Sequence, residues 1–332
     1  MVNLCCWMAC LFLLPSCQKP KIETRYCPLQ ANDTDTIVKQ TFIYAIKDVD
    51  TLRLDKYDHP SVSGNKPCLI FVFGGGFAAG ARDDSAYIPF YKQFAKNGYS
   101  VVAIDYRLGM KNLRKKLKGL NQSQQFEQVI TICNQSITMA VEDLFDATKY
   151  VIEQAPEWHI NTDYVISCGS SAGAITVLQG EYEICNAGKS AIASLKGFNY
   201  AGVISFSGAI FSTTGKLEWA AKPAPILLFH GDADKRVPYD TTTYGKLGFY
   251  GSGYISKQLK NIQTPYYFYS VENTGHEVSN SPMKYNWEEI VTFLTKLVFR
   301  KENLMIDVTE TSIDKPILKE KLTIEDLIGN YK

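Results

Sequence analysis

Residues 165–173 read VISCGSSAG, an apolar run that ends in the pattern Gly-x-Ser-x-Gly. The run predicts a strand buried in a sheet, and a helix is predicted from Ala172 to about Glu183. A serine on a tight strand-to-helix turn has its hydroxyl held above the sheet edge, and small flanking residues are needed because the turn presses against its neighbours. This context predicts that Ser171 is a nucleophile. For the motif alone, a Gly/Ser-rich phosphate-binding turn is the alternative.

A second motif, FGGG at residues 73–76, closes an earlier apolar run. Glycine lets backbone amides approach a substrate oxygen closely, because no Cβ atom stands in the way. The amides of Gly75 and Gly76, together with that of Ala172 after the serine, therefore predict an oxyanion hole for a tetrahedral intermediate. A flexible turn is the competing interpretation.

The chain has four histidines, and only two of them follow Ser171. In hydrolases that carry a nucleophile elbow, the acid and then the histidine follow the serine along the chain. That order excludes His59 and His159. His276, just after the last predicted strand, is the predicted general base, whereas His230 is predicted to hold the loop that follows it by hydrogen bonds. The acid is expected in that loop.

Apolar runs alternate with helical patterns along the body of the chain. This alternation predicts an α/β protein with a mostly parallel sheet and helices on both faces. Strands are expected within 36–55 as an antiparallel pair and at 68–73, 100–105, 165–168, 202–206, 225–229 and 266–270, with helices at 87–97, about 125–154, 172–183 and 284–299. The predicted catalytic domain is 36–300, followed by a polar tail at 301–332 that packs as one short helix at 324–328 or hangs loose.

Taken together, these motifs resemble the α/β-hydrolase superfamily, in particular the esterase and lipase group with an HGGG oxyanion motif, which includes the acetyl-xylan and feruloyl esterase branch. The resemblance covers about residues 66–299. It rests on FGGG at 73–76, DYR at 105–107, GSSAG at 169–173, HGDADKRVP at 230–238 and GH at 275–276. The family pattern His-Gly-x-x-Asp-x-x-Val-Pro implies that the acid is Asp234 and not Asp232. Phe73 stands where the family usually has histidine, and 111–125 resembles an insertion.

The resemblance implies a serine hydrolase that cleaves carboxylic esters through an acyl-enzyme, with Ser171, Asp234 and His276 as its catalytic triad and without a metal or other cofactor. Three alternatives stay open: a serine peptidase of the prolyl-oligopeptidase type, a non-catalytic lipid-anchored binding protein, and an intracellular carboxylesterase. The peptidase usually carries a large extra domain, for which the segment before Lys66 is too short.

Composition and charge limit the partners. The 332 residues include 35 basic and 34 acidic side chains, for a net charge of +1. A nucleic-acid-binding surface needs a basic excess, so nucleic acid is not expected as the main partner. Outside the first 17 residues there are five cysteines without a C-x-x-C spacing, so a zinc site is not expected. A Cys133–Cys185 disulfide is conceivable in an oxidising compartment.

The first 17 residues predict a bacterial lipoprotein signal peptide. An apolar stretch from Leu4 to Leu14 is too short to span a bilayer, and it leads into Leu14-Pro15-Ser16-Cys17, which resembles a lipobox. Cys17 is the expected lipidation site, and 18–35 is the expected tether to a bacterial cell envelope. No Lys or Arg precedes the apolar stretch, so a misread start or a simple secretory signal is the alternative.

The expected substrates are small-molecule or polysaccharide esters, with short acyl groups on carbohydrate-like alcohols. The insertion at 111–125 contains five Lys and Arg residues, and so polar a cover does not suit a lipid surface. Phe77 and Tyr106 can stack on sugar faces or pack structurally. The sequence predicts no oligomeric state.

Overall fold

A computed structural model describes residues 36–188, 195 and 197–311, together with isolated positions at 316, 318, 322, 323, 326 and 329. The predicted signal peptide, Cys17 and the tether lie outside the described residues, as does most of the predicted helix at 324–328. Among the helices of the described part of the chain, none has the length and apolar character needed to cross a membrane.

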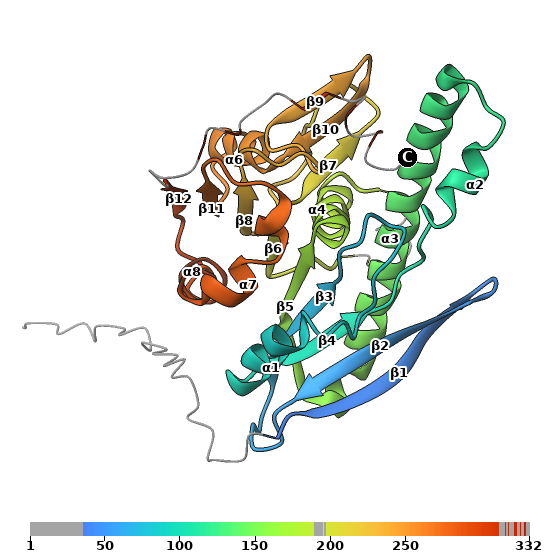
Figure 1. Ribbon diagram of the computed structural model, residues 1–332. Helices are drawn as coiled ribbons and strands as arrows, with labels where there is room; N and C mark the ends of the chain where they lie inside the picture. Colours follow the sequence, from blue (N-terminus) through green and yellow to red (C-terminus); the bar gives the residue numbers. More distant parts are fainter. Residues whose placement is uncertain are drawn as a thin grey trace, which may run out of the picture.

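A mixed sheet forms the centre of the molecule (Figure 1). The described residues build it from nine strands in the order β1-β2-β4-β3-β5-β6-β8-β11-β12. From β4 onwards the strands run parallel, whereas β1 and β2 form an antiparallel hairpin that pairs antiparallel with β4. Their bounds are β1 Val38–Lys47, β2 Asp50–Asp58, β3 Lys66–Val72, β4 Ser100–Ile104, β5 Ile160–Ser170, β6 Gly202–Phe206, β8 Ile226–Gly231, β11 Tyr266–Val271 and β12 Met305–Glu310.

The central strands are apolar because they are covered on both faces. Every residue of β3 and β4 is buried, and Phe71 lies in register with Ala103 on one side and Cys168 on the other. Since β3, β5, β8 and β11 run in the same direction, their carboxyl ends meet at one edge of the sheet. That edge carries the glycine motif, Ser171, the loop after His230, and His276.

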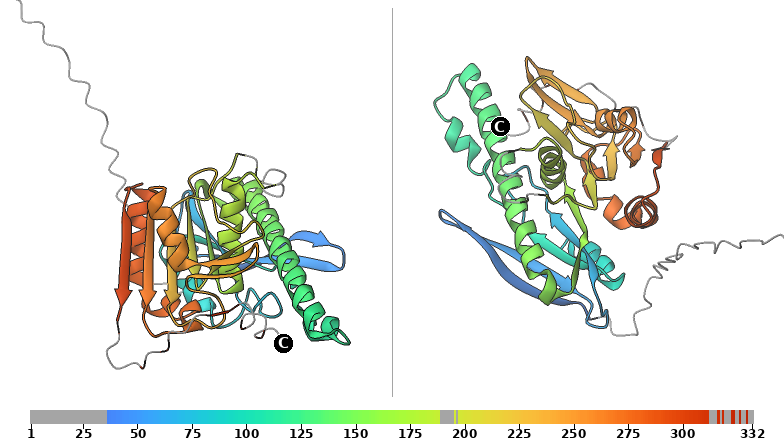
Figure 2. Two further views of the ribbon diagram at one scale, coloured as in Figure 1. Left: turned by 90° about the horizontal axis from the view of Figure 1, so that it is seen from above. Right: turned by 180° about the vertical axis from the view of Figure 1, so that it is seen from behind.

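Helices cover both faces of the sheet (Figures 1 and 2). On one face α1 and α8 are neighbours, with the rings of Phe94 and Trp287 5.0 Å apart, and α3, α4 and α6 lie on the other face. The long helix α3 begins at a capping box, in which the Asn121 side chain accepts from the Gln124 amide. The helix bounds are α1 Ile88–Lys96, α2 Leu113–Leu117, α3 Gln122–Trp158, α4 Ala172–Cys185, α6 Ser252–Asn261, α7 Pro282–Tyr285 and α8 Trp287–Phe293, with the 3-10 helix η1 at His276–Ser279 and the π-helical turn η2 at Leu294–Phe299.

The structure corrects three expectations about elements. The tail predicted at 301–332 contributes β12, which pairs in parallel with β11, so the boundary at residue 300 is too early. The helix predicted at 284–299 is divided at Asn286 into α7 and α8, and it ends in η2. A small antiparallel sheet was not predicted at all, because its strands are short and carry no long apolar run: β7 Ala209–Ser212, β9 Thr241–Tyr244 and β10 Leu247–Gly251.

The described cysteines are all free. Cys68, Cys133, Cys168 and Cys185 are buried thiols, so the disulfide considered between Cys133 and Cys185 does not form. The Cys185 thiol instead donates a hydrogen bond to Glu181 at 3.5 Å. Cys68 and Cys168 lie in strands β3 and β5 and fill the sheet interior as small apolar side chains.

Candidate active site

Ser171 occupies the turn between β5 and α4 with a strained backbone. Its φ of 52° and ψ of −115° place a non-glycine residue in a region that L-amino acids rarely adopt. A Cβ on Gly169 would overlap the Gly173 carbonyl, and a Cβ on Gly173 would overlap the carbonyl of Val72. The Gly-x-Ser-x-Gly pattern is therefore a steric requirement of this turn, as expected for a nucleophile elbow.

The three residues predicted to form a triad lie within hydrogen-bond distance of one another. Ser171 Oγ is 2.8 Å from Nε2 of His276, and Nδ1 of the same imidazole is 2.7 Å from Oδ2 of Asp234. His276 begins η1 just after β11, and Asp234 lies in the loop after β8. The parallel strands thus bring together residues that are far apart in the sequence. With Nδ1–H donating to Asp234, Nε2 is free to accept the serine proton.

Asp234 is 4% exposed as a residue, and its buried carboxylate is hydrogen-bonded through both oxygens. Oδ1 accepts from the amides of Arg236 at 2.7 Å and Val237 at 3.0 Å. Burial alone would raise the pKa of this carboxyl group, but hydrogen bonds and charge from His230 and His276 outweigh burial and hold the pKa well below its usual value. The acid is therefore ionised throughout the neutral pH range.

The two other polar residues of this loop have the positions that the sequence favoured. His230 is fully buried, with Nδ1 2.8 Å from Ser252 Oγ and Nε2 3.2 Å from the Val237 carbonyl. The prediction that it holds the loop is confirmed. Asp232 accepts from the Asn273 amide at 2.7 Å and thereby ties the loop to the turn after β11.

The glycine motif lies beside the elbow. The Gly74 amide donates to Tyr87 Oη at 3.2 Å, whereas the amides of Gly75 and Gly76 donate to no other group in the described part of the chain. Gly75 and Gly76 have φ values of 127° and 62°, and a Cβ on Gly75 would overlap the Ala79 carbonyl. A Cβ on Gly74 would lie 3.1 Å from the Ser170 carbonyl oxygen and 3.2 Å from Ser171 Cβ. The motif and the elbow are thus fitted against each other.

Phe73 is held by an aromatic contact in place of the histidine that usually precedes the glycines. The rings of Phe73 and Tyr106 are 4.5 Å apart, and the Tyr106 hydroxyl donates to the Phe73 carbonyl at 3.0 Å. Tyr106 and Phe77 are both buried. They therefore pack structurally, and the considered stacking of these two rings on sugar faces is wrong.

A hollow of about 500 Å³ opens above Ser171 and His276. Its wall contains Gly75, Gly76 and Ala172, the residues predicted to form the oxyanion hole. Ala172 is the first residue of α4, so its amide has no acceptor within that helix. The remaining lining residues are Gly74, Ala78, Tyr87, Met110, Leu113, Ser170, Ile175, Arg236, Val237, Ser279 and Asn280.

Most of these lining residues carry no signal in the sequence, because only the fold brings them to the site. Leu113 comes from the predicted insertion, which forms α2 and contributes to the wall. Arg236 is different, since it lies within the motif at 230–238 and its nearness to Asp234 could have identified it.

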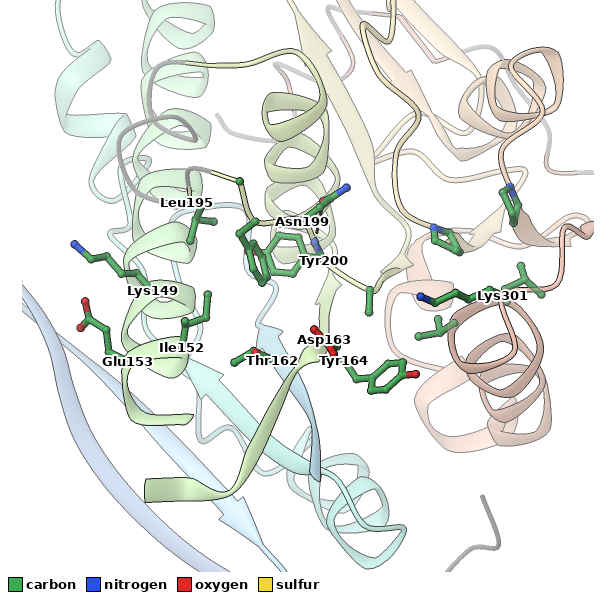
Figure 3. A pocket seen from close by; sticks show the side chains of 17 residues that line it. Lys149, Ile152, Glu153, Thr162, Asp163, Tyr164, Leu195, Asn199, Tyr200 and Lys301 are labelled. Atoms are coloured by element: carbon green, nitrogen blue, oxygen red, sulfur yellow. Dashed lines mark hydrogen bonds between the residues drawn. The ribbon is translucent and has the colours of Figure 1, made fainter. Parts of the chain in front are cut away.

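A larger hollow of about 1040 Å³ lies elsewhere and contains none of the triad residues (Figure 3). Its wall includes Thr162 to Tyr164 near the start of β5, the residues before β6, and Pro225 and Pro265 just before β8 and β11. These are the amino ends of parallel strands, so this hollow lies at the opposite edge of the sheet from Ser171.

Comparisons with known proteins agree with the fold. Residues 54–115 match the BD-FAE family model. No curated protein matches the sequence. Similar solved structures include the native Est2 esterase of the planctomycete Thermogutta terrifontis, which is 17% identical with a TM-score of 0.57, over 78% of this chain and 92% of that one.

Two further structures of the same esterase are similar. One is the enzyme phosphorylated by paraoxon, at 16% identity and a TM-score of 0.53, over 79% of this chain and 95% of that one. The other has butyrate bound, at 17% identity and a TM-score of 0.55, over 78% of this chain and 94% of that one. The fold and the partial family match confirm the predicted resemblance to the α/β-hydrolase superfamily, and the chain has the α/β-hydrolase fold.

Proposed function

We propose that the protein is a serine hydrolase of carboxylic esters. The observation that carries this proposal is the continuous hydrogen-bonded chain from Ser171 through His276 to Asp234, at the wall of a hollow that also contains three candidate oxyanion donors. The BD-FAE match and the esterase neighbours support an ester substrate.

The mechanism follows from the positions of these atoms. His276 Nε2 takes the proton from Ser171 Oγ as the hydroxyl attacks the ester carbonyl, and the imidazolium then delivers that proton to the leaving alcohol. The Asp234 carboxylate keeps the Nδ1–H tautomer and stabilises the imidazolium. The amides of Gly75, Gly76 and Ala172 bind the developing oxyanion. Water then releases the acid from the acyl-enzyme.

Short acyl groups on carbohydrate-like alcohols are the substrates we propose. Part of the wall of the hollow is α2, which contributes Leu113 inside and Arg114, Lys115 and Lys116 along the same turn. Such a basic, polar segment does not dock on a lipid surface, where a contiguous apolar patch is needed. A similar esterase structure has butyrate bound, which also supports a short acyl group.

The nucleophile is tested with Ser171→Ala. This variant should lose nearly all esterase activity and should no longer be labelled by a fluorophosphonate probe, because no other hydroxyl among the described residues is bonded to His276. Ser170→Ala is the matched control and should still be labelled, since Ser170 Oγ donates to the Ser279 carbonyl at 2.8 Å. Labelling that persists in Ser171→Ala would show that another residue is the nucleophile.

The acyl and alcohol preferences need separate substrates. The value of kcat/KM for p-nitrophenyl esters should fall as the acyl chain lengthens from acetate to decanoate, and acetylated xylan should release acetate. A preference for decanoate would refute the short-acyl proposal. If acetylated xylan releases no acetate, the carbohydrate part of the proposal is refuted and the protein is a general carboxylesterase.

We also propose that the protein is exported and anchored to a bacterial envelope through Cys17. This proposal rests on the sequence alone, namely the apolar stretch that ends in Leu14-Pro15-Ser16-Cys17.

A further inference from the structure

Among the described residues that line the hollow above Ser171, Arg236 is the one with a permanent charge. A guanidinium is protonated at every pH at which a protein is folded. The described lining residues include no Asp, Glu or Lys. Among the described residues, the wall that a substrate touches therefore has one fixed positive charge and no carboxylate.

The main chain at Arg236 is held by the triad acid. The Arg236 amide donates to Asp234 Oδ1 at 2.7 Å, and the Val237 amide donates to the same oxygen. The side chain leaves this fixed backbone and is exposed. Within the described part of the chain, its guanidinium forms no ion pair. Its donors are thus available to a ligand.

The position of Arg236 relative to His276 indicates which part of a substrate it meets. Beside the hollow above Ser171 (the first hollow) lies another of about 530 Å³ (the second hollow). Both are lined by Arg236, His276, Ser279 and Asn280. The apolar residues Met110, Leu113 and Ile175 line only the first hollow. Arg236 therefore stands on the histidine side of the site, where the two hollows meet.

During ester cleavage the leaving oxygen must face His276 Nε2, because that nitrogen delivers the proton. The alcohol part of the substrate consequently extends along the side of the site that carries Arg236. The second hollow also contains Lys235 and Glu277, so its described lining residues carry two positive side chains and one negative one.

On the basis of the proposed esterase function, we propose that Arg236 binds a carboxylate on the alcohol part of the ester substrate. A guanidinium presents parallel N–H donors that match the two oxygens of a carboxylate, and such pairs are stronger than neutral hydrogen bonds. The preferred substrates are then short acyl esters of an acidic alcohol, such as a hydroxy acid or an acidic sugar. Because Arg236 is exposed, the preference weakens as ionic strength rises.

The test compares two acetate esters of equal size. In 4-acetoxybenzoate the alcohol part carries a carboxylate, and in 4-acetoxybenzamide it carries a neutral amide. The measured quantity is kcat/KM for the anionic ester divided by kcat/KM for the neutral ester, so the intrinsic reactivities of the two esters cancel when variants are compared. We expect Arg236→Gln to lower this ratio about tenfold, the effect of losing one charge-assisted contact.

Three controls separate charge, shape and position. Arg236→Lys keeps the charge and should retain part of the ratio, whereas Lys92→Gln removes an exposed charge from α1 and should leave the ratio unchanged. Phenyl hydrogen succinate carries a carboxylate on the acyl part, and phenyl acetate carries none. The kcat/KM for phenyl hydrogen succinate divided by that for phenyl acetate should not change in Arg236→Gln.

Each outcome decides the proposal. The proposal is overturned if the anionic-to-neutral ratio of kcat/KM is equal in the wild type and Arg236→Gln. It is also overturned if Arg236→Gln changes the ratio only for the ester pair with the carboxylate on the acyl part. A wild-type protein that hydrolyses the neutral ester but shows no effect of Arg236 refutes the carboxylate site alone. A wild-type protein that hydrolyses none of these esters refutes the esterase function together with this inference.

Discussion

The carboxylate of Asp234 accepts more hydrogen bonds than a triad strictly needs. One oxygen is held by the two amides that follow it in the loop, and the other faces both His276 and His230. These contacts keep the group ionised and fix the tautomer of His276. At the scale of single residues, the site depends on this geometry as much as on the serine.

Replacing Asp234 with Asn should therefore lower kcat by about 10⁴-fold, by analogy with loss of the orienting carboxylate in serine proteases. The amide can still accept from the loop amides, so the fold is kept, but its NH₂ group favours the wrong tautomer of His276. Steady-state kinetics on a p-nitrophenyl acetate substrate measure the loss. Asp232→Asn is the comparison, because Asp232 accepts from the Asn273 amide, whereas His276 Nδ1 is bonded to Asp234. If Asp232→Asn were the crippled variant, the assignment of the acid would be reversed.

The main site residues were predictable because chemistry restricts their types and their order. Only a serine at the elbow and a histidine after the last central strand satisfy the pattern, and the loop motif selects Asp234. Residues such as Tyr87 and Asn280 were not predictable, since they reach the hollow through packing between elements that are distant in the sequence. The contact between His230 and Asp234 likewise arises from the folded loop.

At the scale of elements, α4 carries a buried acid that the proposed reaction does not use. Glu181 is fully buried, nearly three turns beyond the elbow, and accepts from the Ala224 amide. Its second oxygen has no partner among the described residues. Burial raises the pKa of Glu181 to about 7, and the hydrogen bonds from Ala224 and Cys185 to its other oxygen only partly oppose that rise. The helix behind the nucleophile is therefore sensitive to pH.

The sign of this sensitivity follows from linkage. Between pH 4.5 and about 7 the carboxyl is protonated in the folded chain and ionised in the unfolded chain, so the free energy of unfolding falls as pH rises through this range. Glu181→Gln removes the charge, and its stability relative to the wild type should rise by up to about 3 kcal/mol between pH 4.5 and pH 8. Urea unfolding at a series of pH values measures the difference.

The exposed Glu157 near the end of α3 provides the control, because Glu157→Gln should show no such trend. A difference between Glu181→Gln and the wild type that stays constant across this pH range would mean that Glu181 keeps its ordinary pKa in the folded state.

At the scale of the whole molecule, the elements that the sequence predicted best are those that the core covers on both sides. Strands β3, β4 and β6 give unbroken apolar runs, and they were located within two residues. Strand β12 was missed because it is half exposed at the edge of the sheet, so its residues alternate and resemble a polar tail. The sheet of β7, β9 and β10 was missed because short strands are specified by their partners and not by their own composition.

The envelope anchor is also a property of the whole molecule, and Cys17→Ser tests it. Lipidation needs the thiol, so the variant should move from the membrane fraction to the soluble fraction, and labelling with a palmitate analogue should disappear. Fractionation and in-gel fluorescence measure both effects, with Cys68→Ser as a control for the loss of a thiol from the folded domain. Equal distribution of the wild type and Cys17→Ser between the fractions would refute the anchor.

The close packing of the glycine motif against the elbow limits which parts of the site can change during evolution. Gly173 rests against the Val72 carbonyl and Gly74 against the elbow, so neither turn can change shape without displacing the other. The opposite walls, which include Leu113 on α2 and the exposed Arg236, are under no such restriction. Descendants of this chain can therefore acquire new substrates by exchanging side chains on those walls, while the machinery that breaks the ester is inherited unchanged.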